Sequence, residues 1–288
     1  MNYKDLKKIK CQCGSRKPLV KCCLISEVKN KINLSNILPP NPETNFSNSK
    51  CYMRVTNNCS EQISKEHMVS EGALKEVDDL IEVTGFPWLK NNSKQLHTSV
   101  ITSKVLCTRH NSAFSTIDKE GIELVRAIKE FSMTNYSGRQ KLAVFNGLDI
   151  ERWLLKTFYG LLDSKNLQIE PNESLRAEID EKCIDLLNGV IPQADKRGLF
   201  LRYEMNNQIN TERVLSISPI INKLKQNIQG ITINIFGFDF LLSTCPINVE
   251  HSKYRPNYIV FSTPRDTRVI HLIWPQKNKT EIVEFVTF

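Results

Sequence analysis

The distribution of cysteine is the strongest constraint on how this 288-residue chain folds, because seven of its nine cysteines lie within the first 110 residues. They form two groups, which are Cys11, Cys13, Cys22 and Cys23, and then Cys51, Cys59 and Cys107 followed by His110. Sets of four cysteine and histidine side chains are the usual ligands of tetrahedral structural zinc sites. An odd number of cysteines in a chain without a secretory leader disfavours a disulfide framework. The sequence therefore predicts two zinc sites, with about two zinc ions per chain.

The overall composition, with 40% hydrophobic and 24% charged residues, is ordinary for a globular protein. No apolar stretch approaches the roughly 18 residues that a membrane-spanning helix needs. The first eight residues, Met-Asn-Tyr-Lys-Asp-Leu-Lys-Lys, are not followed by the apolar segment of a signal peptide. We therefore expect a cytoplasmic protein with no membrane partner.

The net charge of +8 is concentrated near the N-terminus. Residues 1–31 hold nine Lys and Arg against Asp5 and Glu27, a difference of +7 that falls to +5 if four thiolates bind one Zn²⁺. Such a basic segment favours a polyanionic partner such as nucleic acid. A solubilising basic arm is the alternative interpretation.

The first cysteine group has the spacing C-x-C-x8-C-C, with Gly14 and Ser15 directly after the first pair. Two close cysteine pairs joined by a basic loop can fold with almost no apolar core, because metal binding supplies the folding free energy. This pattern is similar to the SEC-C motif, a zinc knuckle found at the end of the bacterial preprotein-translocase motor ATPase and attached to many other proteins. The family form has Gly where Arg16 stands. The resemblance implies a zinc knuckle over 1–31 that binds a protein partner; reactive cysteines are the alternative.

Residues 32–50 have the composition of a linker. They contain Leu-Pro-Pro-Asn-Pro at 38–42 and are otherwise rich in Asn and Ser. Adjacent prolines and few apolar residues are typical of a spacer rather than of a packed element. We therefore expect residues 1–31 to fold and act independently of the rest.

The second cysteine group is combined with residues that suit different chemistry. Glu66-His67 lies between Cys59 and Cys107, and Asn111 directly follows His110. Carboxylate and amide oxygens suit a magnesium-like ion, and histidine titrates near neutral pH. This arrangement resembles the HNH endonucleases, whose ββα-metal (His-Me finger) core cuts phosphodiesters.

The resemblance assigns a role to each matching residue. It implies that His67 is the general base and that Glu66 and Asn111 bind a labile Mg²⁺ or Mn²⁺. It implies four structural zinc ligands, which are Cys51, Cys59, Cys107 and His110. His110 could instead belong to the labile ion. Arg109, between two zinc ligands, is a candidate phosphate contact, and Asp118 is either a second carboxylate behind the site or a residue of the helix surface.

Three features depart from the family pattern. The first cysteine pair is spaced C-x7-C rather than C-x2-C, and His110 stands where Cys is usual. The middle Asn of the HNH name falls on Thr102 or Ser103. Other residues that can take its role are Asn91, Asn92 and His97.

Hydrophobic spacing predicts the elements around these motifs. After His67 we expect a strand at 68–69, a helix over 71–82, extended segments at 100–101 and 105–106, and a helix beginning at 110–117. Further helices are expected over 122–129, over 150–162 with Asp149 as cap, and over 175–187 with Gly189 as stop. Alternating apolar residues then predict strands at 199–203, 231–235, 236–240, 258–260, 269–273 and 282–286.

The expected fold is therefore α+β. It comprises a zinc knuckle (1–31), a linker (32–50), an HNH nuclease-like ββα-metal core (51–120) and a C-terminal domain of unknown role (121–288), in which helices are followed by an antiparallel sheet. The resemblance implies a metal-dependent endonuclease acting on DNA, in a setting such as defence against phage by fold-level analogy alone. The alternative is a non-catalytic, zinc-dependent nucleic-acid-binding or adaptor protein.

Overall fold

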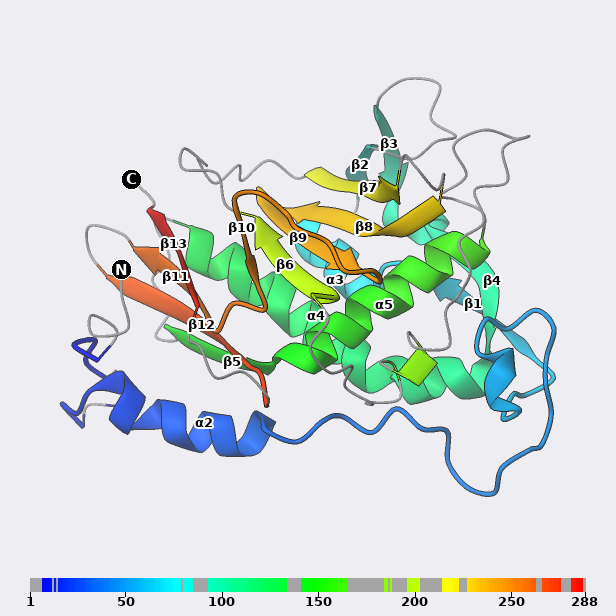
Figure 1. Ribbon diagram of the computed structural model, residues 1–288, viewed down its shortest axis with the longest axis horizontal. Coiled ribbons are helices and arrows are strands. Elements are labelled where there is room, and N and C mark those ends of the chain that lie inside the picture. The colour runs from blue at the N-terminus through cyan, green and yellow to red at the C-terminus, as the bar shows by residue number, and fades with distance from the viewer. Residues whose placement is uncertain are drawn as a thin grey trace.

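Two long helices lie against one another in the middle of the protein, whose structure is a computed structural model (Figure 1). The structure describes residues 7–11, 13, 15–78, 80–84, 93–133, 141–164, 184–185, 187, 196–202, 214–222, 227–262, 266–275 and 281–286. Within these ranges the protein is α+β, with four α-helices and three sheets. The α+β class predicted from the sequence is therefore confirmed.

The first long helix, α4 (Thr108–Ser132), presents a continuous apolar face that includes Phe114, Ile117 and Leu124. These residues recur every three to seven positions, which is the spacing of a helix packed on one side. The helix predicted to begin near 110 and the one predicted over 122–129 are thus a single element. It continues without a break through residue 120, where the sequence had suggested the end of the core.

The second long helix, α5 (Gly147–Asp163), is buried at every residue from 147 to 161. It confirms the helix predicted over 150–162. The predicted cap is wrong, because Asn146 caps the helix by accepting a hydrogen bond from the Leu148 N–H at 3.0 Å. Asp149 is buried in the first turn, where it accepts hydrogen bonds from Ser35 N–H and Arg152. Because this end of the helix is buried, the carboxylate of Asp149 is used to bind Ser35 and Arg152, and Asn146 takes the role of cap.

The predicted helix over 71–82 is shorter than expected. Helix α3 covers Glu71–Val77, and strand β2 (Leu80–Thr84) begins three residues later. Strand β2 pairs with β3 (Ser93–His97) on one side and with β7 (Val214–Asn222) on the other. Pairing with strands distant in sequence outweighs the local helical spacing.

The strands form three sheets (Figure 1). The largest has the order β10-β6-β9-β8-β7-β2-β3, the second β13-β11-β12-β5, and the third contains β1 and β4. Strands not yet given bounds are β1 (Ile63–His67), β4 (Thr102–Cys107), β5 (Leu142–Asn146), β6 (Gly198–Arg202), β8 (Asn227–Ile235), β9 (Phe238–Ser243), β10 (Ser252–Tyr254), β11 (Tyr258–Ser262), β12 (Thr267–Ile273) and β13 (Ile282–Val286). The short 3-10 helices are η1 (Leu19–Lys21), η2 (Arg54–Thr56) and η3 (Thr98–Val100).

The sheet prediction is confirmed for strand positions and wrong for strand direction. All six predicted C-terminal segments lie in or overlap strands. However, β2–β7, β11–β13 and β12–β5 are parallel pairs, so the two larger sheets are mixed rather than antiparallel. Apolar alternation reveals a strand but not the direction of its neighbours. The helix predicted over 175–187, with its stop at Gly189, lies outside the described residues except at 184, 185 and 187.

The N-terminal segment packs against the four-stranded sheet. Cys11 and Leu19 belong to one apolar cluster with Tyr258, Val260 and Val269. Helix α2 (Cys23–Lys31) lies along β5, and Lys31 pairs with Glu120 of α4. From there residues 32–50 run along the molecule to its other end, where β1 and β4 lie (Figure 1).

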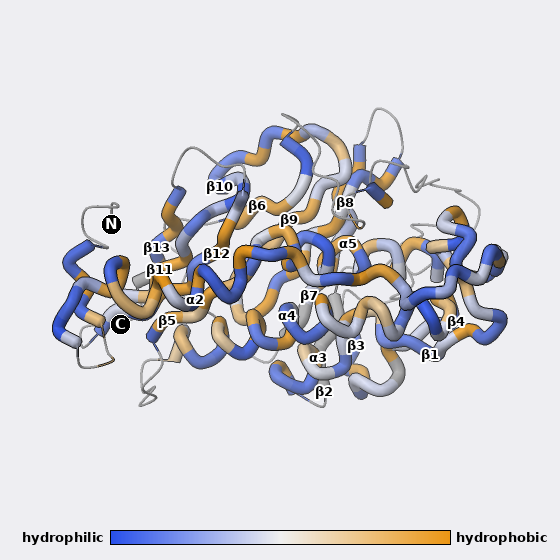
Figure 2. The backbone as a smooth tube through the Cα atoms, turned by 90° about the horizontal axis from the view of Figure 1, so that it is seen from below, coloured by the Kyte–Doolittle hydropathy of each residue, from blue (hydrophilic) through white to orange (hydrophobic). Residues whose placement is uncertain are grey.

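A single large cluster of buried apolar side chains extends through the sequence from Ile37 to Phe285. Figure 2 shows hydrophobic residues over much of β6, β9 and β11. No helix in the described part of the chain combines the length and the apolar character needed to cross a membrane. The segment 51–120 and the C-terminal strands therefore share one core.

Candidate functional site

Strands β1 and β4 pair antiparallel, and β4 leads directly into α4. Their register sets Ile63 opposite Cys107 at one end and His67 opposite Thr102 at the other, with an irregularity between Ser64 and Glu66. This unit brings the last residues of β4 and the first turn of α4 beside β1. Two clusters of polar side chains form around it.

The first cluster contains Cys51, Cys59, Cys107 and His110, whose ligand atoms all lie within 4.8 Å of one another. Each of these side chains is at most 1% exposed. The Nδ1 atom of His110 lies 3.1 Å from Cys107 Sγ and 3.7 Å from Cys51 Sγ. The cluster can hold a metal ion, and three sulfurs with one imidazole nitrogen suit zinc.

Neighbouring groups orient these ligands. The other ring nitrogen of His110, Nε2, lies 3.1 Å from Thr56 Oγ1, a contact that fixes the ring. The backbone N–H of Ser60 donates to Cys107 Sγ, and the Cys107 N–H donates to Cys51 Sγ, both at 3.4 Å. A hydrogen bond from Cys51 lowers the pKa of Cys107 to about 2, and the same pairing raises the pKa of Cys51. Negative charge at this buried position favours a bound cation.

The second group of cysteines also converges. The sulfurs of Cys11, Cys13, Cys22 and Cys23 lie within 4.8 Å of one another, so this cluster can hold a metal ion too. The backbone is closed into a hairpin by Cys11 N–H donating to Lys17 O at 2.8 Å. Arg16 has a φ of 57°, the left-handed conformation that favours glycine. This backbone conformation explains why the SEC-C pattern has glycine at the position of Arg16.

A further cluster, which we call the Lys156 cluster, consists of Glu66, Asn111, Asp118 and Lys156. The Lys156 ammonium forms an ion pair with Glu66 Oε1 and another, at 2.5 Å, with Asp118 Oδ2. With its amide oriented to suit both neighbours, Asn111 places its nitrogen 3.0 and 3.1 Å from the two Glu66 oxygens and accepts from Ser64 Oγ at 2.9 Å. Asp118 also accepts from Ser70 Oγ at 2.5 Å.

Glu66 and Asn111, which the resemblance to HNH enzymes assigns to one labile ion, are in contact with one another, but these residues do not fit a divalent ion here. Both carboxylate oxygens of Glu66 already interact with Lys156 or Asn111. Burial raises the pKa of Glu66 against the opposing effect of Lys156. Burial lowers the pKa of Lys156, but Glu66 and Asp118 outweigh it and the net pKa is raised.

Sequence reasoning missed Lys156 and left Asp118 between two roles. Asp118 joins the cluster instead of lying on the helix surface. Lys156 comes 90 residues after Glu66, within the apolar run Trp-Leu-Leu-Lys-Thr-Phe of α5. A lysine within a run of large apolar residues at the centre of a helix is the signal that reveals it, because such a charge needs a partner once it is buried.

His67 lies half-buried beside this cluster. Among the described residues, neither its buried Nε2 atom nor the buried hydroxyl of Tyr52 has a hydrogen-bond partner. Both residues line a cavity of about 10 Å³, together with Glu66 and Lys156. That volume is about what one water molecule needs. Burial lowers the pKa of His67 below its ordinary value of 6.5, which favours the neutral imidazole.

Arg109 lies on α4 with its side chain directed at the linker. Its Nε donates to Asn58 Oδ1 at 3.0 Å, and its guanidinium also donates to the carbonyls of Pro40 and Pro42, the latter at 2.7 Å. Arg109, which the sequence predicts to contact a phosphate, instead holds the linker against α4 in this structure.

The residues that can replace the middle Asn of the HNH name are dispersed. Thr102 pairs with His67, and Ser103 with Glu66, across the β1–β4 ladder. His97 lies at the end of β3, where its Nδ1 contacts Ser99 Oγ at 2.7 Å. Asn91 and Asn92 lie outside the described residues. Thr102 is therefore the residue of this set that is nearest in register to the proposed base.

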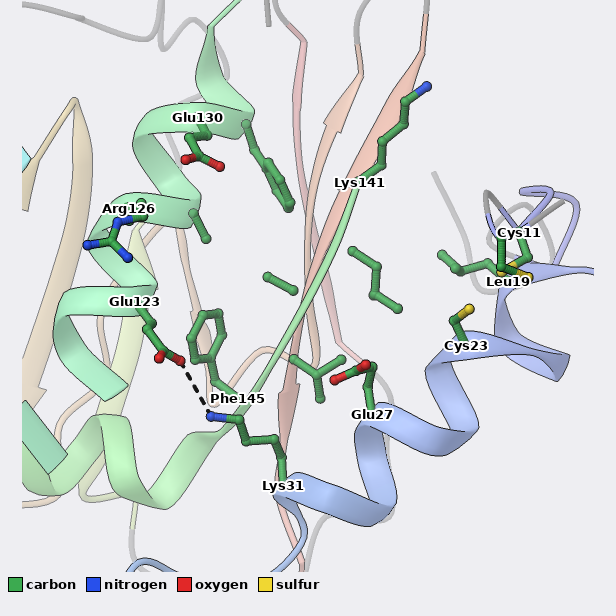
Figure 3. Close-up of a pocket in the computed structure, with 16 residues that line it drawn as sticks. Cys11, Leu19, Cys23, Glu27, Lys31, Glu123, Arg126, Glu130, Lys141 and Phe145 are labelled. Carbon is green, nitrogen blue, oxygen red and sulfur yellow. Dashed lines mark ion pairs between the residues drawn. The ribbon is translucent and has the colours of Figure 1, made fainter. Parts of the chain in front are cut away.

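A larger hollow of about 510 Å³ lies between α2, α4 and β5 (Figure 3). Glu27, Lys31, Glu123 and Arg126 surround it, and Lys31 pairs with Glu123 at 3.6 Å. The charges are mixed and partly paired. None of the residues of the Lys156 cluster lines it.

Comparison of the chain with protein-family models, with curated proteins and with solved structures finds no match. The function must therefore be argued from the chemistry of the site itself.

Proposed function

We propose that this protein is an HNH-type endonuclease that hydrolyses phosphodiester bonds in DNA, with His67 as general base. One observation carries the proposal. The antiparallel pair β1–β4 leads into α4, with a zinc-type ligand set at their junction and with Glu66, His67 and Asn111 beside it. This order of elements and residues supports a ββα-metal core.

The surroundings of His67 suit the activation of water. His67 and Tyr52 both line a cavity that accommodates one water molecule, and within the described part of the chain the His67 Nε2 and the Tyr52 hydroxyl have no hydrogen-bond partner. Neutral His67 accepts one proton from water, and the resulting hydroxide forms a new P–O bond. One ester P–O bond breaks, the leaving oxygen gains a proton from solvent, and His67 returns its proton to solvent. Each cleavage consumes one water molecule.

The zinc ligands have a structural role in this proposal. A zinc ion bound by Cys51, Cys59, Cys107 and His110 would hold the end of β4 against the loop that precedes β1. That arrangement keeps the first turn of α4, and with it Asn111, beside Glu66. The choice of a nucleic acid as substrate rests on the net charge of +8, which favours a polyanion, and the choice of DNA rests on the resemblance to HNH enzymes.

The test is a plasmid-nicking assay with His67→Asn. Loss of a general base lowers the rate by about 10²-fold or more. His251→Asn is a matched control, since His251 is exposed in a loop and has a φ of 52°, which asparagine tolerates. Because burial lowers the pKa of His67, the rate should rise with pH through a midpoint below 6.5. A His67→Asn protein that cuts as fast as the wild type would refute the mechanism.

A second candidate function is a non-catalytic, zinc-dependent nucleic-acid-binding or adaptor protein. It is favoured by the buried ion pairs of Lys156 with Glu66 and Asp118, at the position where HNH enzymes bind their catalytic ion. This candidate predicts that the wild type binds DNA without nicking it, whether or not Mg²⁺ or Mn²⁺ is added.

A further inference from the structure

Lys156 is the buried cation closest to the proposed catalytic residues among the described side chains. It lies in the middle of α5, and its side chain is 5% exposed. Burying an ammonium is unfavourable unless it is paired and hydrogen-bonded. Two carboxylates, from β1 and α4, satisfy it. Three elements distant in sequence therefore converge on this one positive charge.

The ammonium occupies the position that the resemblance to HNH enzymes gives to a metal ion. Glu66 is the expected acidic ligand, and one of its oxygens binds Lys156 Nζ. Asn111, the expected ligand from the helix, contacts the same carboxylate instead of a cation. A divalent ion placed here would have to displace the ammonium and then lie close to a like charge.

The surrounding packing holds Lys156 in this position. Residues 147–161 of α5 are all buried, so the helix cannot move away without exposing apolar surface. On either side of Lys156, Trp153 Nε1 donates to Ser70 Oγ at 2.9 Å and Gly160 packs near Met68. The adjacent cavity of about 10 Å³ is too small for a displaced ammonium. It is also too small for an ion such as Mg²⁺, which usually keeps several of its waters.

We infer that the Lys156 ammonium takes the place of the labile divalent ion, so that this core neither needs nor binds Mg²⁺ or Mn²⁺ at Glu66. The inference rests on the proposed function, which identifies Glu66 and Asn111 as the metal-binding position. In this protein a side chain from a neighbouring helix supplies the local positive charge. Lys156 is thus a positioning residue, and the acidic groups around it constitute a divalent-ion site only when its charge is removed.

Binding of Mn²⁺ to the zinc-loaded protein tests the inference without relying on activity. Electron paramagnetic resonance reports the free Mn²⁺ that remains after mixing. We expect no Glu66-dependent binding by the wild type, and about one Mn²⁺ bound per chain by Lys156→Ala, in which the carboxylates of Glu66 and Asp118 are released from the ammonium. The double variant Lys156→Ala/Glu66→Gln should lose that site. Lys129→Ala is the matched control, since Lys129 pairs with Glu76 outside the cluster.

The wild type alone can overturn the inference, even if Lys156→Ala fails to fold. Binding of Mn²⁺ by the wild type that disappears in Glu66→Gln would show that a divalent ion does displace Lys156. A folded Lys156→Ala that binds no Mn²⁺ would also contradict it.

DNA cleavage is measured separately, with zinc-loaded protein in buffer freed of other divalent ions. Cleavage there supports the inference, whereas cleavage only after Mg²⁺ or Mn²⁺ is added overturns it. Absence of cleavage under every condition counts against the proposed function and leaves the Mn²⁺ result to decide the inference.

Discussion

The zinc-type cluster and the Lys156 cluster lie around the same β1–β4–α4 unit, yet they balance buried charge in opposite ways. In the first, three cysteines and His110 present sulfur and nitrogen atoms to one another, with no cationic side chain among them. In the second, a lysine that belongs to the chain pairs with two carboxylates, and the Asn111 amide contacts one of them. The first can therefore hold an ion from solution, whereas the second is complete as soon as the chain folds.

This difference follows from the donor atoms and from the neighbouring helix. Thiolates bind zinc strongly, and a lysine would be a poor substitute for that bond. Carboxylates accept hydrogen bonds from an ammonium as readily as they bind a hard ion. Helix α5 passes beside Glu66 and supplies that ammonium, while it contributes no ligand to the cysteine cluster.

The largest effect should come from breaking the zinc-type cluster with Cys107→Ser. Structural zinc contributes about 10 kcal/mol or more in small zinc domains, which is comparable to the whole stability of a typical protein. We expect this variant to lose one zinc ion per chain and its cooperative thermal unfolding. Elemental analysis and circular dichroism measure the two effects.

Cys245→Ser provides the control for Cys107→Ser. Cys245 is only partly buried and belongs to neither metal-type cluster of the described residues. Its replacement should leave zinc content and melting temperature unchanged. A Cys107→Ser protein that keeps its zinc and its melting temperature would show that this cluster is an ordinary apolar contact.

The next largest effect should come from Lys156→Met, which leaves Glu66 and Asp118 without their cation. Removing one partner of a buried ion pair typically costs about 3–5 kcal/mol. Urea unfolding at pH 7 measures that loss. Lys129→Met is the matched control, because Lys129 is about one-third exposed and its loss should cost at most about 1 kcal/mol. Equal effects of the two substitutions would mean that the Lys156 cluster is solvated rather than buried.

The effect of Lys156→Met on stability should depend on pH. The pKa of Lys156 in the folded protein lies above its ordinary value of 10.5, so its stabilising effect is complete below that pH. It is lost as the pH rises through the folded pKa. The raised pKa of Glu66 favours its protonated form in the folded protein, an effect lost as the pH rises through that pKa. The difference in the free energy of unfolding between the wild type and Lys156→Met should therefore become smaller toward acidic pH, and smaller again above pH 10.5.

The sequence predicts the contents of the cysteine clusters better than those of the Lys156 cluster, for a physical reason. Metal ligands have characteristic spacings, so the cysteines and His110 can be grouped from their positions along the chain. Lys156 becomes part of a site only through the packing of α5 against β1. Its distance from Glu66 in the sequence carries no such signal.

The same contrast holds for the fold. Helix α5 and the six predicted C-terminal strands follow from apolar spacing alone. The end of α3 at Val77 and the parallel pairing of β2 with β7 do not, because they depend on strands far along the chain. Local pattern therefore gives the elements, and long-range pairing decides their limits and directions.

The smallest expected effect concerns Arg109, whose predicted role was a phosphate contact. Its guanidinium donates to Asn58, Pro40 and Pro42, and it is partly exposed, so Arg109→Ala should cost only about 1 kcal/mol in urea unfolding. A side chain that contacts a DNA phosphate also contributes about one unit to the slope of log affinity against log salt concentration. Because the linker carbonyls already occupy this guanidinium, we expect the slope for Arg109→Ala to match that of Arg126→Ala. Arg126 likewise carries one positive charge and pairs within the chain, with Glu76 at 2.7 Å. A slope reduced by one unit in Arg109→Ala alone would mean that DNA displaces the linker from Arg109, and would add this residue to the nucleic-acid-binding surface of the proposed nuclease.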